Sequence, residues 1–216
     1  MSITTQEAVA RALIEIGAVG FSPESPVTFK SGLVSPVYVD NRRLPYHPQQ
    51  WHTVIQGFAD VITEKALAFD VIGGIAVGGV PHSSALAYHM QQPSIFVRKE
   101  AKEHGKMQRV EGGDVQQKTV LLVEDLVTTG GSSLSGVTAL RDEGAIVTDM
   151  VAIVSYEFAT SKTALADAGI QFHALTNFAT ILTIAEADGI FTAEQGTVIR
   201  DWFGKPNTWA ERHGFA

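Results

Sequence analysis

The sequence lacks cysteine altogether, has few basic residues and contains no long apolar run. The absence of cysteine from 216 residues excludes disulfide scaffolds, thiolate nucleophiles and zinc–sulfur or iron–sulfur sites. Lys and Arg number 16 against 23 Asp and Glu, and the resulting net charge of −7 argues against a broad nucleic-acid-binding surface. No stretch approaches the ~20 apolar residues of a membrane span, and the N-terminus does not resemble a signal peptide. We therefore expect a cytoplasmic globular protein that binds neither nucleic acid nor membrane.

Several common catalytic and nucleotide-binding motifs are also missing. No two glycines stand at i and i+2, which excludes G-x-G-x-x-G, and no Gly-Lys-Ser/Thr of a Walker loop occurs. G-x-S-x-G and H-E-x-x-H are absent too. A metal-dependent hydrolase is a weak alternative, because the seven histidines are scattered and none is followed by Glu.

Apolar periodicity predicts an α/β fold. Thr4 and Glu7 have capping-box spacing before an apolar helical face, Gly17 and Gly20 end that helix, and Pro48 opens a longer one. From residue 70 onward, short apolar runs alternate with helical segments, which is typical of a parallel sheet covered on both faces. The expected strands are 71–76, 94–97, 119–123, 146–154 and 171–175, after a hairpin at 27–40; the expected helices are 81–90, 132–141, 161–168 and two or three beyond Asn177.

A single domain, residues 1–216, accounts for this pattern. Residues 1–47 are expected to form an N-terminal helix and a hood, 48–175 the α/β core, and 176–216 a helical extension. Residues 98–117 show no periodicity and are expected to form a mobile loop. Loops of that length are uncommon in compact domains unless they serve as lids or binding loops.

The most specific segment is Val120–Ser133, with the sequence VLLVEDLVTTGGSS. Its apolar residues predict a buried strand with Glu124 and Asp125 at its end, where open α/β sheets bind ligands. Thr128–Ser133 supply hydroxyls, flexible glycines and the N–H groups of a helix start, a combination that holds phosphate. Carboxylates can bind sugar hydroxyls, and the neighbouring turn can bind a phosphate, so together they suit a phosphorylated ribose. The alternative is an ordinary turn after two solvated acids.

Two further segments can each be interpreted as a binding site or as an ordinary structural feature. In this otherwise acidic protein, one loop contains six basic residues: Arg98, Lys99, Lys102, His104, Lys106 and Arg109. Such a loop could bind a polyanion and then close over it. The alternative is a solvated charge run, partly neutralised by two glutamates. The turn within 73–81 offers the N–H groups of Val77, Gly78 and Gly79 as a second anion cradle. Its alternative is close packing of a helix on the sheet.

Three segments carry a resemblance to a known family. Residues 120–133 resemble the phosphoribosyl-pyrophosphate motif of type I phosphoribosyltransferases. Residues 29–42, FKSGLVSPVYVDNR, and 98–105, RKEAKEHG, are similar to the N-terminal signature and the catalytic loop of orotate phosphoribosyltransferases. The resemblance implies a glycosyltransferase with a mostly parallel sheet, a small hood and a helical C-terminal tail. It also implies transfer of 5-phosphoribosyl from phosphoribosyl pyrophosphate to orotate, in UMP biosynthesis.

The same resemblance implies roles for individual residues. Phosphoribosyl pyrophosphate is expected to contact Arg98, Lys99, Lys102, His104, Glu124, Asp125, Thr128, Thr129, Gly130, Gly131, Ser132, Val77 and Gly78. The implied catalytic residues are Lys99, Lys102, His104 and Asp125, and the implied orotate-binding residues are Lys30, Tyr38, Val39, Thr128 and Arg42. Mg²⁺ is expected to arrive with the pyrophosphate and to reach Glu124 and Asp125 through water. A homodimer that shares loop 98–109 between subunits is also implied.

The sequence departs from the family pattern at two positions. Gly78 stands where the family often has lysine, and no arginine follows the strand that ends in Val154, where many members use one to bind the orotate carboxylate. A desolvated carboxylate needs a charge-assisted partner, so we hypothesise that Arg42, Arg43 or N–H groups near residues 30–32 replace it. The missing arginine favours a related transferase acting on a purine or uracil, whereas residues 29–42 favour orotate. The acidic charge argues against a non-catalytic sensor of phosphoribosyl pyrophosphate that regulates transcription.

Overall fold

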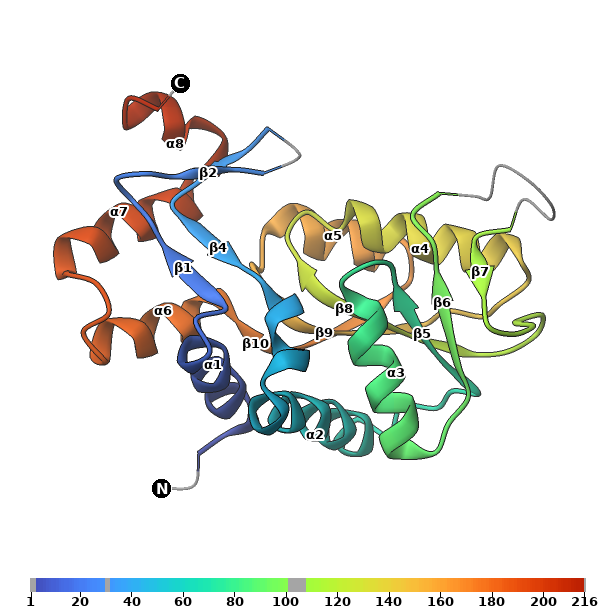
Figure 1. The fold of residues 1–216 in the computed structure, drawn as a ribbon. Coiled ribbons are helices and arrows are strands. Elements are labelled where there is room, and N and C mark those ends of the chain that lie inside the picture. Colours follow the sequence, from blue (N-terminus) through green and yellow to red (C-terminus); the bar gives the residue numbers. More distant parts are fainter. Residues whose placement is uncertain (1–2, 30–31, 101–107, 216) are drawn as a thin grey trace.

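A computed structural model describes residues 3–29, 32–100 and 108–215, and they are built around a six-stranded sheet with the order β10-β9-β8-β5-β6-β7. Neighbouring strands are parallel, except that β7 is antiparallel to β6. The predicted mostly parallel sheet flanked by helices is therefore confirmed (Figure 1). The strands are Val71–Ile75 (β5), Ser94–Val97 (β6), Val110–Glu111 (β7), Val120–Val127 (β8), Asp149–Ser155 (β9) and Gln171–Asn177 (β10).

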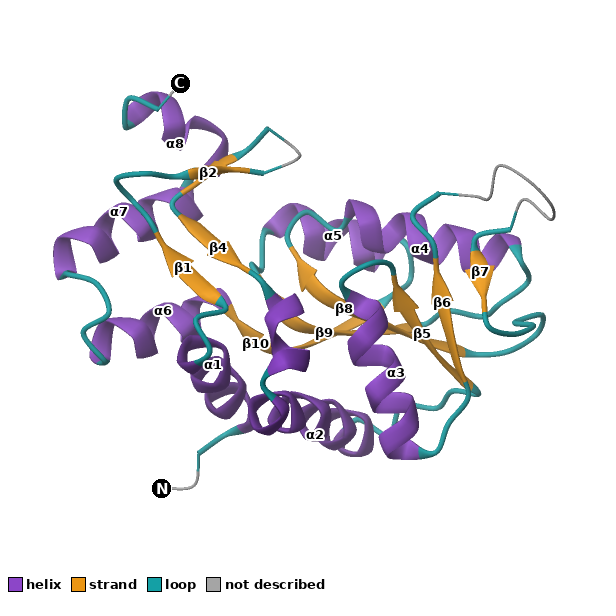
Figure 2. Ribbon diagram, viewed as in Figure 1, coloured by secondary structure: helices purple, strands orange, loops and turns teal. Residues whose placement is uncertain are grey.

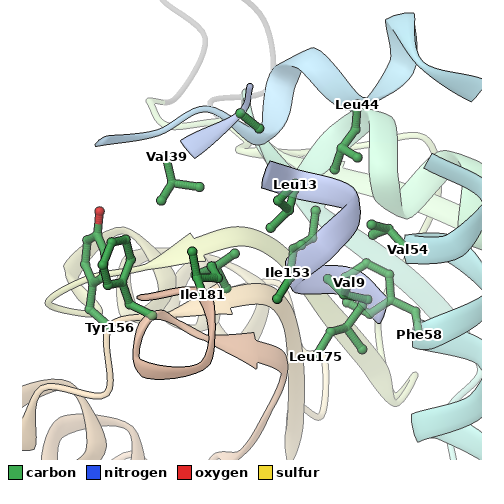
Figure 3. Close-up of a cluster of buried hydrophobic side chains, with 14 of the residues drawn as sticks. Val9, Leu13, Val39, Leu44, Val54, Phe58, Ile153, Tyr156, Leu175 and Ile181 are labelled. Carbon is green, nitrogen blue, oxygen red and sulfur yellow. The ribbon is translucent and has the colours of Figure 1, made fainter. Parts of the chain in front are cut away.

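Helices cover both faces of this sheet, and the apolar runs of the strands are buried between them. On one side lie α1 (Thr5–Glu15), α2 (Pro48–Glu64) and α3 (Gly79–Met90), and on the other α4 (Gly131–Asp142) and α5 (Ala159–Asp167) (Figure 1). Leu121 of β8 belongs to a buried cluster with Phe58 of α2, part of which is drawn in Figure 3. The next residue, Leu122, belongs to a second cluster with Leu140 of α4. Successive side chains of β8 thus enter different cores, which explains why its sequence is apolar without alternation.

The hood, defined here as residues 19–39, contains two small antiparallel sheets (Figure 2). Strand β1 (Val19–Phe21) pairs with β4 (Val37–Val39), and β2 (Val27–Thr28) pairs with β3 (Val34–Ser35). The prediction of one hairpin over 27–40 is therefore wrong in part, because β4 pairs with a strand ahead of the hairpin. That strand, β1, is too short to show alternation in the sequence. A 3-10 helix, η1 (Asn41–Tyr46), joins the hood to α2.

Three helices follow the sheet, as predicted: α6 (Phe178–Ala187), α7 (Ala193–Gly204) and α8 (Pro206–Arg212). Pro206 occupies the first turn of α8, where its missing N–H is not needed. Trp202 of α7 is fully buried, and its indole nitrogen donates a hydrogen bond of 2.7 Å to the carbonyl oxygen of Val34. The C-terminal helices therefore pack against the hood (Figure 1).

Several expected boundaries within the core differ from those in the structure. The strand expected at 119–123 continues to Val127, because β8 keeps its pairing with β9 past the two acids. The strand expected at 146–154 begins at Asp149, and the helix expected at 81–90 begins at Gly79. Part of the expected loop 98–117 is anchored, since β7 pairs with β6 and Val115 is buried.

Among the described residues, no helix has both the length and the apolar character needed to span a membrane.

Candidate active site

The carboxyl ends of the parallel strands lie at one edge of the sheet, and a cavity opens there. The turns after β5 and β8 and the residue after β9, Tyr156, all leave from this edge. The cavity has a volume of about 460 Å³. It is lined by Phe29, Tyr38 and Val39 of the hood, by residues 126–133 and by Tyr156. The structure thus brings the predicted phosphate turn together with two of the predicted orotate-binding residues, Tyr38 and Val39.

The turn at 128–130 leads into α4 without a capping side chain. Helices α1, α6 and α7 have their first N–H groups capped by Thr4, Asn177 and Thr192. At α4 the N-cap residue is Gly130, which has a φ of +83° and no side chain to offer. Only glycine adopts this conformation without strain. The N–H groups at the start of α4 consequently have no capping side chain, and they could bind an anion.

The turn at 76–78 packs closely on β8. A Cβ atom on Gly79 would lie 2.5 Å from the carbonyl oxygen of Val123, and one on Gly78 would overlap the carboxylate of Asp125. The close-packing interpretation of these glycines is therefore confirmed, and a side chain in place of Gly78 would require the carboxylate of Asp125 to move. The turn still presents an uncapped helix start, because α3 has no capping side chain and Val77 is 78% exposed. The Ala76–Val77 peptide bond is cis.

Glu124 and Asp125 lie next to this turn and not in the wall of the cavity. Asp125 is half-buried, and its carbonyl oxygen accepts a hydrogen bond of 2.7 Å from the side chain of Asn41. Glu124 is only 4% exposed. Burial, reinforced by the adjacent carboxylate of Asp125, raises the pKa of Glu124 well above its usual range. The expectation that both acids end the strand and face the crevice is corrected: they lie within β8, and Asp125 is the more accessible of the two.

His82 is a buried neighbour of this pair that the sequence did not single out. It lies on α3, and its Nδ1 accepts a hydrogen bond of 3.0 Å from the indole nitrogen of Trp51. Its Nε2 is buried without a partner among the described residues. Burial lowers the pKa of His82 from 6.5 to about 4, and the charge of Asp125 partly opposes this shift. No motif marks this histidine; its burial follows from the packing of α2 on α3.

The basic loop is held at its two ends. The backbone N–H of Arg98 donates to the carbonyl of Arg109, and the Arg109 guanidinium donates to the carbonyl of Arg98 and to Ser135 of α4, at 2.8 to 3.0 Å. Arg98 also pairs with Glu111 at 3.4 Å. Lys99, the second residue after β6, is exposed at the same sheet edge as the cavity. The predicted residues Lys102 and His104 of this loop, and Lys30 of the hood, lie outside the described residues.

Arg42 and Arg43 point to different partners. The Arg42 guanidinium donates to the Tyr38 hydroxyl at 2.8 Å and pairs with Asp40. Arg43 instead donates to the carbonyl of Gly17, at the end of α1. Of the two arginines, Arg42 is therefore the one connected to a cavity residue.

In the part of the chain that the structure describes, no group of three or more His, Cys, Asp or Glu side chains could hold a metal ion.

Comparison with known proteins agrees with this geometry. Residues 47–165 match the family model of the phosphoribosyl transferase domain. An α/β sheet with a glycine-rich turn after a buried strand that carries two acids, together with this match, defines the class: the chain is a type I phosphoribosyltransferase.

Similar proteins narrow the class further. The chain is 35% identical over 201 residues to orotate phosphoribosyltransferase of Coxiella burnetii. The alignment covers 93% of this chain and 96% of that protein. UMP synthase of Leishmania donovani has a TM-score of 0.82 and 29% identity, covering 93% of this chain and 42% of that longer one. For orotate phosphoribosyltransferase of Aeropyrum pernix the TM-score is 0.72 and the identity 28%, covering 82% of this chain and 97% of that chain. The chain belongs to the orotate phosphoribosyltransferase family.

The burial of neutral His82 predicts a loss of stability in mild acid. Because the pKa falls from 6.5 to about 4 on folding, the unfolded chain binds the proton first. Neutral His82 therefore contributes about 3 kcal/mol to the free energy of unfolding above pH 6.5, and this stabilisation is lost as the pH falls toward 4. Urea unfolding between pH 7 and pH 4 should show a shallower pH dependence for His82→Gln than for the unchanged protein. His52→Gln, at an exposed histidine of α2, serves as the control. Equal pH dependence in the unchanged protein and His82→Gln would contradict this account.

Proposed function

We propose that this chain transfers a 5-phosphoribosyl group from phosphoribosyl pyrophosphate to N1 of orotate. The products are orotidine 5′-monophosphate and pyrophosphate, and the reaction belongs to UMP biosynthesis. The observation that carries this proposal is the single cavity in which the uncapped turn 128–133 faces the aromatic residues of the hood. Such a cavity suits a sugar phosphate at one end and a flat base at the other.

Different groups of site residues bind different parts of the substrate. Thr128, Thr129, Gly130, Gly131 and Ser132 bind the 5′-phosphate through N–H groups and hydroxyls. Asp125, with Glu124 buried beside it, holds the ribose hydroxyls and stabilises positive charge on the ring. The N–H groups of Val77 and Gly78 contact the pyrophosphate. Tyr38, Val39, Thr128 and Arg42 surround the base, together with Lys30.

The chemical difficulty is to separate pyrophosphate from an anomeric carbon that becomes cation-like. Hydrogen-bond donors must be directed at the charge that grows on the leaving group, in a site closed to water. Arg98, Lys99, Lys102 and His104 perform this task when the loop closes. The anchoring of the loop by Arg109 on α4 supports this role, since it fixes the point from which the loop reaches the sheet edge.

Mg²⁺ would be bound by the pyrophosphate and would neutralise part of its charge. A hard cation that keeps several waters would suit a site with few protein ligands, and the half-buried carboxylate of Asp125 would hold one of those waters, with Glu124 buried behind it.

A homodimer that shares loop 98–109 between two sites completes the proposal, and it rests on the family resemblance of that loop. The acidic charge and the lack of cysteine support a cytoplasmic location.

Turnover with a panel of bases tests the function directly. Orotate, uracil, adenine, hypoxanthine and xanthine are each incubated with phosphoribosyl pyrophosphate and Mg²⁺, and pyrophosphate release is measured. We expect turnover with orotate to exceed that with every other base. Because the described wall of the cavity contains no cationic side chain, a transferase for a purine or uracil is the second candidate, and preference for one of those bases would establish it. Binding of phosphoribosyl pyrophosphate without any turnover would instead indicate a sensor.

Replacement of Lys99 tests the role of the loop. Since its contact should form fully only as pyrophosphate departs, Lys99→Ala should lower kcat by about 10²–10³-fold and change both KM values much less. Steady-state kinetics provides the measurement. Lys118→Ala is a matched control, because Lys118 is exposed at the opposite end of β8. An unchanged kcat for Lys99→Ala would refute this role.

Arg42 and Arg43 provide a matched pair for base recognition. Arg42→Ala should raise the KM for orotate about tenfold, or ~1.4 kcal/mol, because its guanidinium lies on Tyr38 of the cavity wall. Arg43→Ala should leave that KM unchanged, because Arg43 faces Gly17. Both variants are assayed at saturating phosphoribosyl pyrophosphate. If Arg42→Ala has the same KM for orotate as the unchanged protein, Arg42 does not replace the missing arginine as the partner of the orotate carboxylate.

A further inference from the structure

Tyr156 combines two properties: it lines the cavity, and its hydroxyl group is buried without a hydrogen-bond partner among the described residues. The residue is 4% exposed. A buried polar atom without a partner destabilises the folded chain, so such atoms are few and each one requires an explanation. A ligand oxygen in the cavity would supply the missing partner.

The position of this hydroxyl is fixed by its surroundings. The backbone N–H of Tyr156 donates to the carbonyl of Val127 at 3.0 Å, which holds the residue to the end of β8. Its ring packs against Phe178, Trp202 and Phe203, with centroids 5.4 to 5.8 Å apart. In Figure 3 the hydroxyl points away from the sheet, on the side where Val39 lies. The hydroxyl is therefore held in a defined position by an aromatic cluster.

The protonation state makes this group a hydrogen-bond donor. Burial raises the pKa of Tyr156 above its usual range, so the hydroxyl keeps its proton at neutral pH. A neutral phenol in an apolar wall donates well to a carbonyl or carboxylate oxygen.

The other polar groups of the cavity have different tasks. The Tyr38 hydroxyl already accepts a hydrogen bond from Arg42. The hydroxyls at 128–133 belong to the phosphate turn at the start of α4. Phe29 lies over the Tyr156 ring, with centroids 6.5 Å apart and planes within 15°, so the Tyr156 end of the cavity is aromatic and suits the flat base.

We propose that the Tyr156 hydroxyl donates a hydrogen bond to an exocyclic oxygen of the pyrimidine substrate and so contributes to the choice of base. The proposal rests on the proposed function, because it assigns a residue to the base end of the same cavity. Tyr156 thereby supplies part of the recognition at a point in the chain where the sequence has no arginine.

The test is Tyr156→Phe, which removes the hydroxyl and keeps the ring. We expect kcat/KM for orotate to fall at least tenfold, mainly through KM, while the KM for phosphoribosyl pyrophosphate stays within twofold. The melting temperature should be unchanged or higher, because the hydroxyl has no partner to lose in the free protein. A group with a purely structural role would lower the melting temperature and leave the ratio of the two KM values unchanged.

Thr176→Val is the matched control. Thr176 of β10 also has a buried hydroxyl without a partner in the described part of the chain, but it lines a different cavity. This variant should keep the KM for orotate. If Tyr156→Phe keeps kcat/KM for orotate within twofold, the proposal is overturned. Failure of the proposed function can be distinguished from failure of this proposal, because it appears as a lack of orotate turnover by the unchanged protein. In that case Tyr156→Phe is assayed with the base that the unchanged protein does use. An unchanged KM for that base overturns the proposal in the same way.

Discussion

The close contact between the 76–78 turn and β8 is the constraint on which the rest of the site depends. Gly79 brings the start of α3 against the backbone of Val123, and Gly78 lies on the carboxylate of Asp125. Because β5 and β8 are parallel neighbours, this contact places two uncapped helix starts, those of α3 and α4, at adjacent strand ends. Two uncapped helix starts on either side of one half-buried carboxylate suit the pyrophosphate and the sugar phosphate of the proposed substrate.

The same region contains most of the unsatisfied polar groups of the described chain. Asn41, His82, Glu124 and Tyr156 each have a buried atom without a partner. Such atoms reduce stability, by about 1–3 kcal/mol each, so the fold must be stabilised elsewhere. The two apolar clusters on either face of the sheet do this, which leaves the carboxyl edge free to hold groups that are complete only with a ligand.

How much was predictable from the sequence depended on whether the signal was local. The apolar run before Glu124 and the Thr-Thr-Gly-Gly that follows predicted the buried strand and the phosphate turn, because both are set by residues close in the chain. Strand β1 escaped prediction, since its pairing partner β4 is distant and its three residues show no pattern. The burial of Glu124 and His82 also escaped, because it is imposed by β9 and α2 packing from other parts of the chain. The candidate site was thus predictable in its residue types and motifs, and less so in the exposure of each side chain.

The C-terminal helices illustrate how such non-local packing shapes the cavity. From the sequence, the tail at Trp202–Trp209 could cover either the site or a dimer interface. In the structure, α7 carries Trp202, whose ring packs on Tyr156 and whose indole donates to Val34 of the hood. One side chain therefore connects the wall of the cavity at Tyr156 to the hood that covers it. Since neither the hood hairpin nor a single residue after β9 has a core of its own, the geometry of the cavity at Tyr156 depends on α7. The extension is in this sense part of the site, although no residue of it lines the cavity.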